Sequence, residues 1–238
     1  MALPIVETPR YECTLASQDT QVQYRPFLVK EEKILLVAME SKDNNEIINA
    51  TKQVIQACTY NKIDVDKLPM FDIEYLLLQI RAKSVGEISK FKVVCPDDKQ
   101  TVTDVELDLS TVEVQVEDDH TNKIVIDEKR NLGLVLNYPS LGITKAGFDV
   151  NKTDSDSMFN VICSCIDHIY EGDKVYPAKD STQKELKDFL ESITQKAFLD
   201  IKKFFETAPQ LRHEVEVTNP KTGVKSKVTF KGLQDFFQ

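Results

Sequence analysis

The residues best suited to nucleophilic or metal chemistry in this sequence are three histidines and five cysteines. One histidine and two cysteines lie close together, as Cys163, Cys165 and His168. On a helix, residues 163 and 165 point about 200° apart, so they do not share an ion easily. Cys165 has isoleucines around it at helical spacing, which favours a small buried thiol over a metal ligand. We therefore predict no metal site in this segment.

Nucleophilic catalysis and phosphate binding also receive little support. The sequence has no Gly-x-Ser-x-Gly turn, and His120 falls in a polar turn where we expect a solvated side chain. Residues 142–147 have the glycine spacing of a phosphate-binding loop, but Phe148 and Asp149 follow where lysine and a hydroxyl residue are needed. Paired carboxylates fall in turns and at helix starts, where capping explains them. We predict no catalytic residue and no cofactor.

The charge balance restricts the class of partner. Asp and Glu number 39 against 30 Lys and Arg, which gives a formal net charge of -9. Such a chain lacks the basic face that binds nucleic acid or an anionic membrane. The longest apolar run, residues 34–39, is far shorter than the roughly 20 residues that span a bilayer. The N-terminus does not resemble a secretory signal, and the scattered cysteines indicate reduced thiols in a cytoplasmic setting.

The apolar periodicity that must position these side chains predicts an α+β fold. Helical segments are expected to pack with antiparallel hairpins and a mid-chain antiparallel sheet. In a first segment, residues 1–86, alternation over 10–29 indicates a hairpin and three helices should follow, the last over about 69–83. In a second segment, 87–150, we expect one sheet of four or more strands over residues 87–137.

The third segment, residues 151–238, is expected to be helical and to end in a hairpin. A helix should begin at Asp154 or Ser155 and carry apolar residues as far as Ile169. A polar connector follows, and Thr182-x-x-Glu185 is a capping box that opens a long helix to about residue 207. The three segments could form one compact unit. Helix, short break and hairpin occur in the same order twice, which is a weak internal repeat.

Two groups of residues are candidates for partner binding. Arg25, Pro26 and Phe27 follow the second strand of the first hairpin, and Pro26 indicates that this strand lies at an edge or ends there. We expect strand addition at this edge. At the C-terminus, Phe236 and Phe237 either form an aromatic anchor for a partner or close the last hairpin against the long helix.

Several strings, in their order and spacing, resemble the baseplate hub subunit or hub-assembly protein family of T-even-type contractile-tailed bacteriophages. They are residues 24–36, which begin Tyr24-Arg25-Pro26-Phe27, residues 71–76 and 81–87, residues 204–211, and the ending Gly232-Leu233-Gln234-Asp235-Phe236-Phe237. Some members of the family carry Cys-x-x-Cys pairs on their hairpins, like small zinc ribbons. This sequence has only Cys95 in the first hairpin and Asn219-Pro220-Lys221-Thr222-Gly223 in the second. Zinc is therefore not carried over, and the family supplies no catalytic residues.

The resemblance implies a non-enzymatic tail protein that takes part in assembly of the baseplate central hub. Its partners would be other baseplate, hub or tape-measure proteins, without nucleic acid or membrane insertion. It would act in the host cytoplasm during assembly and, if it is retained, lie in the virion tail. Alternatives are a transient chaperone for the tape-measure or hub protein that is absent from the mature virion, a small metal-dependent enzyme, and an adaptor that binds a host protein.

Overall fold

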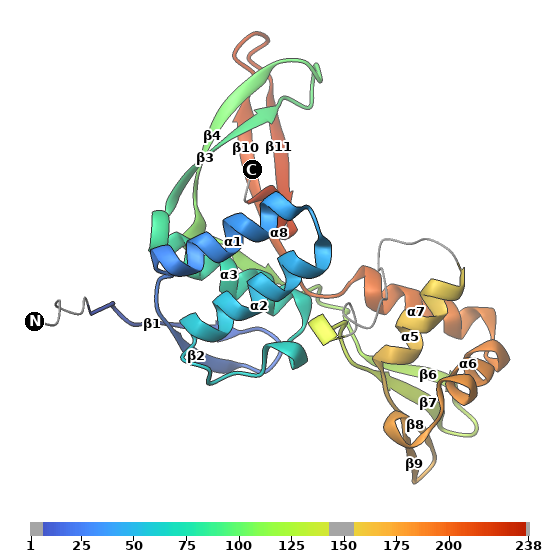
Figure 1. Cartoon of the computed structure of the whole chain (residues 1–238). Coiled ribbons are helices and arrows are strands. Elements are labelled where there is room, and N and C mark those ends of the chain that lie inside the picture. The colour runs from blue at the N-terminus through green and yellow to red at the C-terminus, as the bar shows by residue number, and fades with distance from the viewer. Residues whose placement is uncertain (1–6, 143–154, 237–238) are drawn as a thin grey trace, which may run out of the picture. The chain divides into compact units, whose positions relative to one another are not determined.

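The computed structural model describes residues 7–142 and 155–236 (Figure 1). By its contacts the chain divides into unit 1, Met1–Gln115 with Gln210–Gln238, and unit 2, Val116–Pro209. Both units combine helices with antiparallel strands, which confirms the α+β class. The unit limits differ from the expected divisions at 86/87 and 150/151, because a C-terminal strand pairs with a mid-chain strand and brings the last hairpin into unit 1.

Unit 1 begins with the expected hairpin and helices. The hairpin consists of β1 (Tyr11–Leu15) and β2 (Thr20–Tyr24), and the helices are α1 (Val29–Ser41), α2 (Asn44–Cys58) and α3 (Met70–Val85), with a 3-10 turn η1 (Val65–Lys67) before α3. Asp43 caps α2 by accepting hydrogen bonds from the backbone N–H groups of Asn45 and Glu46. Lys42, in the left-handed conformation, ends α1 just before that cap, so the local sequence sets the turn between the helices.

Helix α3 is the central element of unit 1. Its buried residues lie on all sides, because the helix contacts α2, β1 and two C-terminal elements. The Asp72 carboxylate, fully buried in its first turn, accepts hydrogen bonds from the backbone N–H of Ala16 at 3.0 Å and from the hydroxyl of Ser17. Asp72 thus attaches the turn of the first hairpin to α3.

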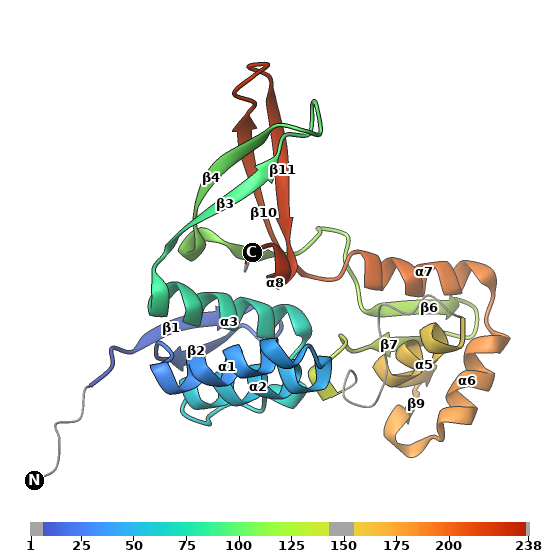
Figure 2. The same ribbon diagram turned by 45° about the horizontal axis from the view of Figure 1, so that its top comes forward.

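Two further hairpins pack against each other in unit 1. They are β3 (Ile88–Val94) with β4 (Val102–Asp108), and β10 (Gln210–Thr218) with β11 (Lys225–Lys231). Figures 1 and 2 show them side by side in both views. Their inner faces form one apolar cluster, in which the rings of Phe91 and Phe230 are 5.1 Å apart. The short strand β5 (Glu113–Gln115) extends the second hairpin by pairing with β10, and a single helical turn, α8 (Gly232–Asp235), follows β11.

The expected single sheet over residues 87–137 is therefore wrong. The strands are present, but they belong to three sheets: β3 pairs only with β4 in the described residues, β5 joins β10 and β11, and the remaining strands lie in unit 2. Alternation along a strand shows which face is buried, but it does not show which strand lies beside it.

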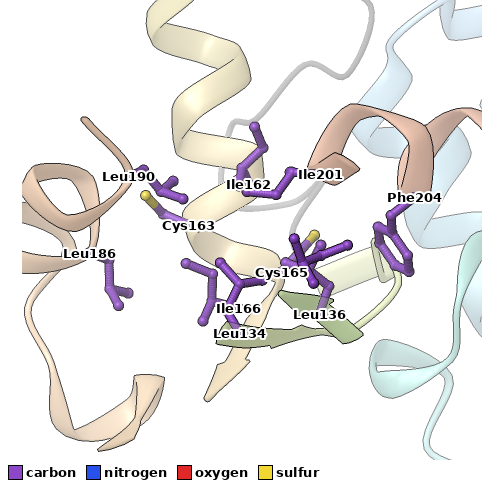
Figure 3. Close-up of a cluster of buried hydrophobic side chains, with 11 residues drawn as sticks. Leu134, Leu136, Ile162, Cys163, Cys165, Ile166, Leu186, Leu190, Ile201 and Phe204 are labelled. Carbon is purple, nitrogen blue, oxygen red and sulfur yellow. The ribbon is translucent and has the colours of Figure 1, made fainter. Parts of the chain in front are cut away.

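Unit 2 is a four-stranded antiparallel sheet with helices on one face. The strands, in spatial order, are β6 (Lys123–Asp127), β7 (Leu132–Leu136), β8 (Ile166–Glu171) and β9 (Lys174–Pro177). The helices are α5 (Ser155–Cys165), α6 (Gln183–Ser192) and α7 (Gln195–Glu206). The chain also forms two short 3-10 turns, η2 (Leu109–Thr111) in unit 1 and η3 (Ala178–Asp180) in unit 2. Figure 3 shows the core between sheet and helices, to which Leu134, Ile162, Leu190 and Phe204 contribute.

Three expectations for this part of the chain are corrected. The helix predicted to reach Ile169 ends at Cys165, because Ile166 to Glu171 pair with β7 as strand β8. The polar connector contains β9, which pairs with β8. The long helix is two helices, because Ile193 and Thr194 are extended and the Thr194 hydroxyl caps α7 by accepting from the N–H of Ala197. The Thr182 capping box is confirmed.

Close packing at Gly133 fixes the middle of this sheet. A Cβ at this position in β7 would collide with the Tyr170 hydroxyl of β8 and with the Ile124 carbonyl of β6. Only glycine fits between the two neighbouring strands here. Within the described ranges, no helix has the length and apolar character needed to cross a membrane.

Candidate interaction sites

Arg25 lies in a network that fixes the entry to α1. Its backbone N–H donates to the Cys58 carbonyl at 3.0 Å, and its guanidinium donates to Glu31 Oε1 at 2.9 Å. Glu31 is 2% exposed and also accepts from the Leu28 N–H at 2.8 Å. Burial raises the pKa of Glu31, but the hydrogen bonds from Arg25 and Leu28 outweigh it and hold that pKa below its usual value. Arg25 thus connects β2, α1 and α2, and its guanidinium is already engaged within the fold.

The neighbouring residues Pro26 and Phe27 are half-buried. The Phe27 N–H donates to Ser84 Oγ at 2.9 Å, which ties this segment to α3. Among the described strands β2 pairs only with β1, as an edge strand would. Strand addition at residues 25–27 stays a prediction.

Phe236 is fully buried in the cluster between the paired hairpins and α3, and its ring lies 5.7 Å from that of Phe230. Of the two alternatives for the terminal aromatic pair, Phe236 follows the second, because it closes the last hairpin against a helix. The helix is α3, whereas we expected the helix over 182–207. An exposed anchor at Phe236 is not what the structure shows, and Phe237 lies outside the described residues.

An exposed apolar surface lies on α1, directly after the predicted segment. We call Val29, Leu36, Val37 and Met39 the α1 surface; their side chains are 80%, 54%, 56% and 61% exposed. Sequence reasoning recognised a short apolar helix but not that one side of it is uncovered. The unbroken apolar run of residues 34–39 could have indicated this exposed side, because six consecutive apolar residues cover more of the helix circumference than the single face that a helix buries.

A second exposed apolar surface lies at the end of the paired hairpins. We call the turns 95–99 and 219–223 with the valines that flank them the hairpin tip. Val94, Val102 and Val224 are 52%, 51% and 46% exposed, and the first two share the face of β3 and β4 that is opposite to the buried Phe91. Val94 and Val102 are directly opposite each other across β3 and β4.

The two turns have the same backbone geometry. Each has proline in its second position and a left-handed fifth residue, Lys99 at φ 55° and Gly223 at φ 72°. The N–H of that residue donates to the carbonyl of the first, at 2.9 Å to Cys95 and 2.8 Å to Asn219. The weak repeat in the sequence is thus accompanied by a repeat of turn geometry.

Hydrogen bonds join these turns to each other. The Asp97 carboxylate accepts from Asn219 Nδ2 at 2.9 and 3.0 Å and from Thr222 Oγ1 at 2.6 Å. Hydrogen bonds from Thr222 and Asn219 hold the pKa of Asp97 below its usual value. At the four positions where paired Cys-x-x-Cys turns would carry thiols, this chain has Cys95, Asp98, Asn219 and Thr222. In the part of the chain that the structure describes, no three His, Cys, Asp or Glu side chains gather as a metal site would need.

His120 is a residue whose environment the sequence did not reveal. Its ring stacks on Tyr138 and Phe204, with centroids 5.6 and 5.3 Å away. Its Nδ1 lies 2.9 Å from Thr207 Oγ1 and its Nε2 lies 2.8 Å from the Tyr138 hydroxyl. Because the Thr207 hydroxyl donates to the Lys203 carbonyl, it is placed to accept from Nδ1–H. The expectation of a solvated histidine is wrong, since its partners come from distant segments.

Burial lowers the pKa of His120, although Asp119 and Glu117 act in the opposite direction. Cys163, Cys165 and His168, for which we predicted no shared metal site, lie in α5 and on β8. His168 lies on β8, where its Nδ1 is 2.7 Å from Asp167 Oδ2. Figure 3 shows the Cys163 sulfur beside Leu190, apart from Cys165. The prediction of a buried thiol at Cys165 is confirmed, and burial raises the pKa of that thiol to about 12.

Comparison with known families shows which class of protein carries these surfaces. A family model described as "T4 bacteriophage base plate protein" matches residues 8–238. The chain belongs to this family. No curated protein and no solved structure matches the chain significantly. Family membership indicates a structural protein of the bacteriophage baseplate, in the virion tail, and it implies contacts with other baseplate proteins. The family is generally non-enzymatic.

Proposed function

We propose that this baseplate protein helps to assemble the central hub of the baseplate, and that it acts without catalysis through contacts with other hub, baseplate or tape-measure proteins. The observation that carries the proposal is the hairpin tip, an exposed apolar surface on a rigid support. Exposed apolar residues grouped on one surface are typical of docking sites. Val94 and Val102 face each other across two strands and are both about half exposed.

The rigidity of the hairpin tip favours its use in docking. Asp97 joins the two turns, and Phe91 and Phe230 pack the hairpins together below them. A surface that is already ordered loses little conformational entropy when a partner binds. On the same face as the valines, the cross-strand pairs Lys92 with Asp104 and Lys90 with Glu106 supply the polar rim that surrounds the apolar centre of most interfaces.

The test replaces the exposed valine pair by a pair that the hairpin already tolerates. Lys90 and Glu106 face each other four residues away on the same face, so Val94→Lys with Val102→Glu keeps a favourable cross-strand pair and removes the apolar pair. The matched control is Lys90→Glu with Glu106→Lys, which reverses a charge pair on the same face. Each variant is supplied in trans to a phage that lacks the gene, and completed baseplates are counted by sedimentation and electron microscopy.

We expect the control to restore baseplates and the valine double variant to fail, while both show the unfolding transition of the wild type. Baseplates formed at the wild-type level by the valine double variant would overturn the proposal. Residence in the virion is measured separately, by quantifying the protein in purified tails. Its presence there supports a permanent subunit, whereas absence from tails with association to hub intermediates in the host cytoplasm supports the transient chaperone.

A further inference from the structure

Among the exposed charged residues beside the apolar residues of the α1 surface are a cation and an anion, Lys33 and Glu40, at helical spacing. Lys33 and Glu40 lie on the same side of the helix as Val29 and Leu36, because the steps of three and four residues between them each bring the chain back to one face. The opposite side, with Glu31 and Ala38, is buried. Within the described residues, the side chains of Lys33 and Glu40 make no ion pair or hydrogen bond, so both charges are available to a partner.

This arrangement is complementary to itself. Lys33 precedes Leu36 by three residues, and Glu40 follows Val37 by three. If two copies of α1 lie antiparallel with a twofold axis between positions 36 and 37, each Lys33 faces the second copy's Glu40. In the same register Leu36 faces the second copy's Val37, so the apolar residues meet at the centre. A twofold interface repeats each contact, which gives two ion pairs around one apolar centre.

We propose that the α1 surface is the contact between two copies of this chain, paired antiparallel through α1. The charges favour a second copy over a foreign helix of one sign, because an acidic or a basic partner would meet either Glu40 or Lys33 as a like charge. They also select the register. Moving the axis onto Leu36 would place Glu32, which is exposed, opposite the second copy's Glu40.

The contact is independent of the hub role, because the hairpin tip uses other residues. The α1 face stays compatible with the fold when its charges change, since Lys33, Leu36 and Glu40 are exposed and buried contacts lie on the other side. Variants at these positions therefore report on association rather than on folding.

The test is the association state of the full-length protein, measured by sedimentation equilibrium over a wide range of concentration at low and high salt. We expect the wild type to form dimers. Lys33→Glu and Glu40→Lys should each weaken the dimer by roughly tenfold or more, because each variant places like charges together. The double variant K33E/E40K should recover most of the wild-type affinity, since the ion pairs are restored with their signs exchanged.

Two further variants keep the result interpretable. Leu36→Lys should abolish the dimer, and Lys62→Glu, an exposed charge reversal elsewhere in unit 1, should leave it unchanged. A wild-type protein that is monomeric at every concentration would overturn the proposal. A dimer that tolerates Leu36→Lys, or one that the double charge exchange does not recover, would overturn it as well.

Discussion

Asp97 and Asn219, which are 122 positions apart in the chain, are joined by hydrogen bonds of 2.9 and 3.0 Å from the Asn219 amide to both oxygens of the Asp97 carboxylate. This contact joins two turns of the same geometry at the ends of two hairpins. Asn219 also accepts from the backbone N–H of Lys221 at 2.8 Å, so it organises its own turn as well. A polar contact thus performs the joining that thiolates and zinc would perform in a ribbon of paired Cys-x-x-Cys turns.

Removing this contact should loosen the hairpin tip. Asn219→Ala deletes the donor to Asp97 and the acceptor of its own turn, and Asn219 is only 1% exposed. We expect a loss of about 1–3 kcal/mol in the free energy of unfolding. Amide exchange in residues 221–224 should accelerate more than exchange in α3. Lys221→Ala, an exposed change in the same turn, is the control and should have little effect; equal exchange rates in both variants would argue against the role of Asn219.

We expect the buried Asp72 to contribute stability that increases as the pH falls. Burial raises its pKa, although hydrogen bonds from Ser17 and Ala16 act in the opposite direction. A carboxyl group whose pKa is higher in the folded than in the unfolded state contributes stability at low pH, and this contribution is lost as the pH rises through the folded-state value. The difference in unfolding free energy between wild type and Asp72→Asn should therefore shift in favour of the wild type between pH 7 and pH 4. Urea titrations at both pH values measure it, and a difference that is constant with pH would contradict the assignment.

His120 predicts the opposite response in unit 2. Its pKa is lowered by burial, so the folded state favours the neutral ring, and stability is lost as the pH falls below about 6.5 through the folded-state pKa. An NMR titration of the imidazole should give a value below that of a free histidine. His120→Phe keeps the stacking on Tyr138 and Phe204 but loses two hydrogen bonds, which should cost about 1 kcal/mol at neutral pH. The variant should also lose this pH dependence; an unchanged acid response would assign it to another group.

Gly133 predicts a steric effect on the sheet of unit 2. A methyl group at this position meets the Ile124 carbonyl and the Tyr170 hydroxyl. We expect Gly133→Ala to destabilise the protein toward the upper end of the range of about 1–3 kcal/mol for overpacked sites, because a backbone oxygen does not move aside. Gly172→Asn, in an open turn of the same sheet with a left-handed backbone that asparagine tolerates, should be nearly neutral in thermal unfolding. Equal losses in the two variants would show that the close approach at Gly133 is not the cause.

Features set by neighbouring residues could be predicted from the sequence. The first hairpin, helices α1 to α3, the capping box at Thr182 and the hairpin of β10 and β11 all follow from periodicity, capping and turn residues. The errors concern choices that local patterns leave open. Alternation in residues 87–137 did not reveal that β5 pairs with β10, and the apolar residues of 162–169 fit helix and strand until the pairing of β8 with β7 decides.

The candidate sites likewise combine features that the local sequence predicts with features that depend on residues far apart in the chain. Pro26 indicated that β2 lies at an edge or ends there, but the ion pair that engages Arg25 depends on Glu31, which lies in α1. For the aromatic pair at the C-terminus, the sequence left open both an anchor and closure of the hairpin, and only the packing of the two hairpins shows why Phe236 is buried. The contact between Asp97 and Asn219 requires two turns to meet in space, which neither turn predicts alone.

The most direct test of the proposed hub role is cross-linking from the hairpin tip in infected cells. A photoreactive amino acid is placed at position 94 and, in a parallel strain, at position 175, where the exposed valine of β9 serves as the matched control. After irradiation, the cross-linked partners are identified by mass spectrometry. Position 94 should capture a baseplate hub or tape-measure protein that position 175 does not. Capture of host proteins alone, or the same partners from both positions, would contradict it.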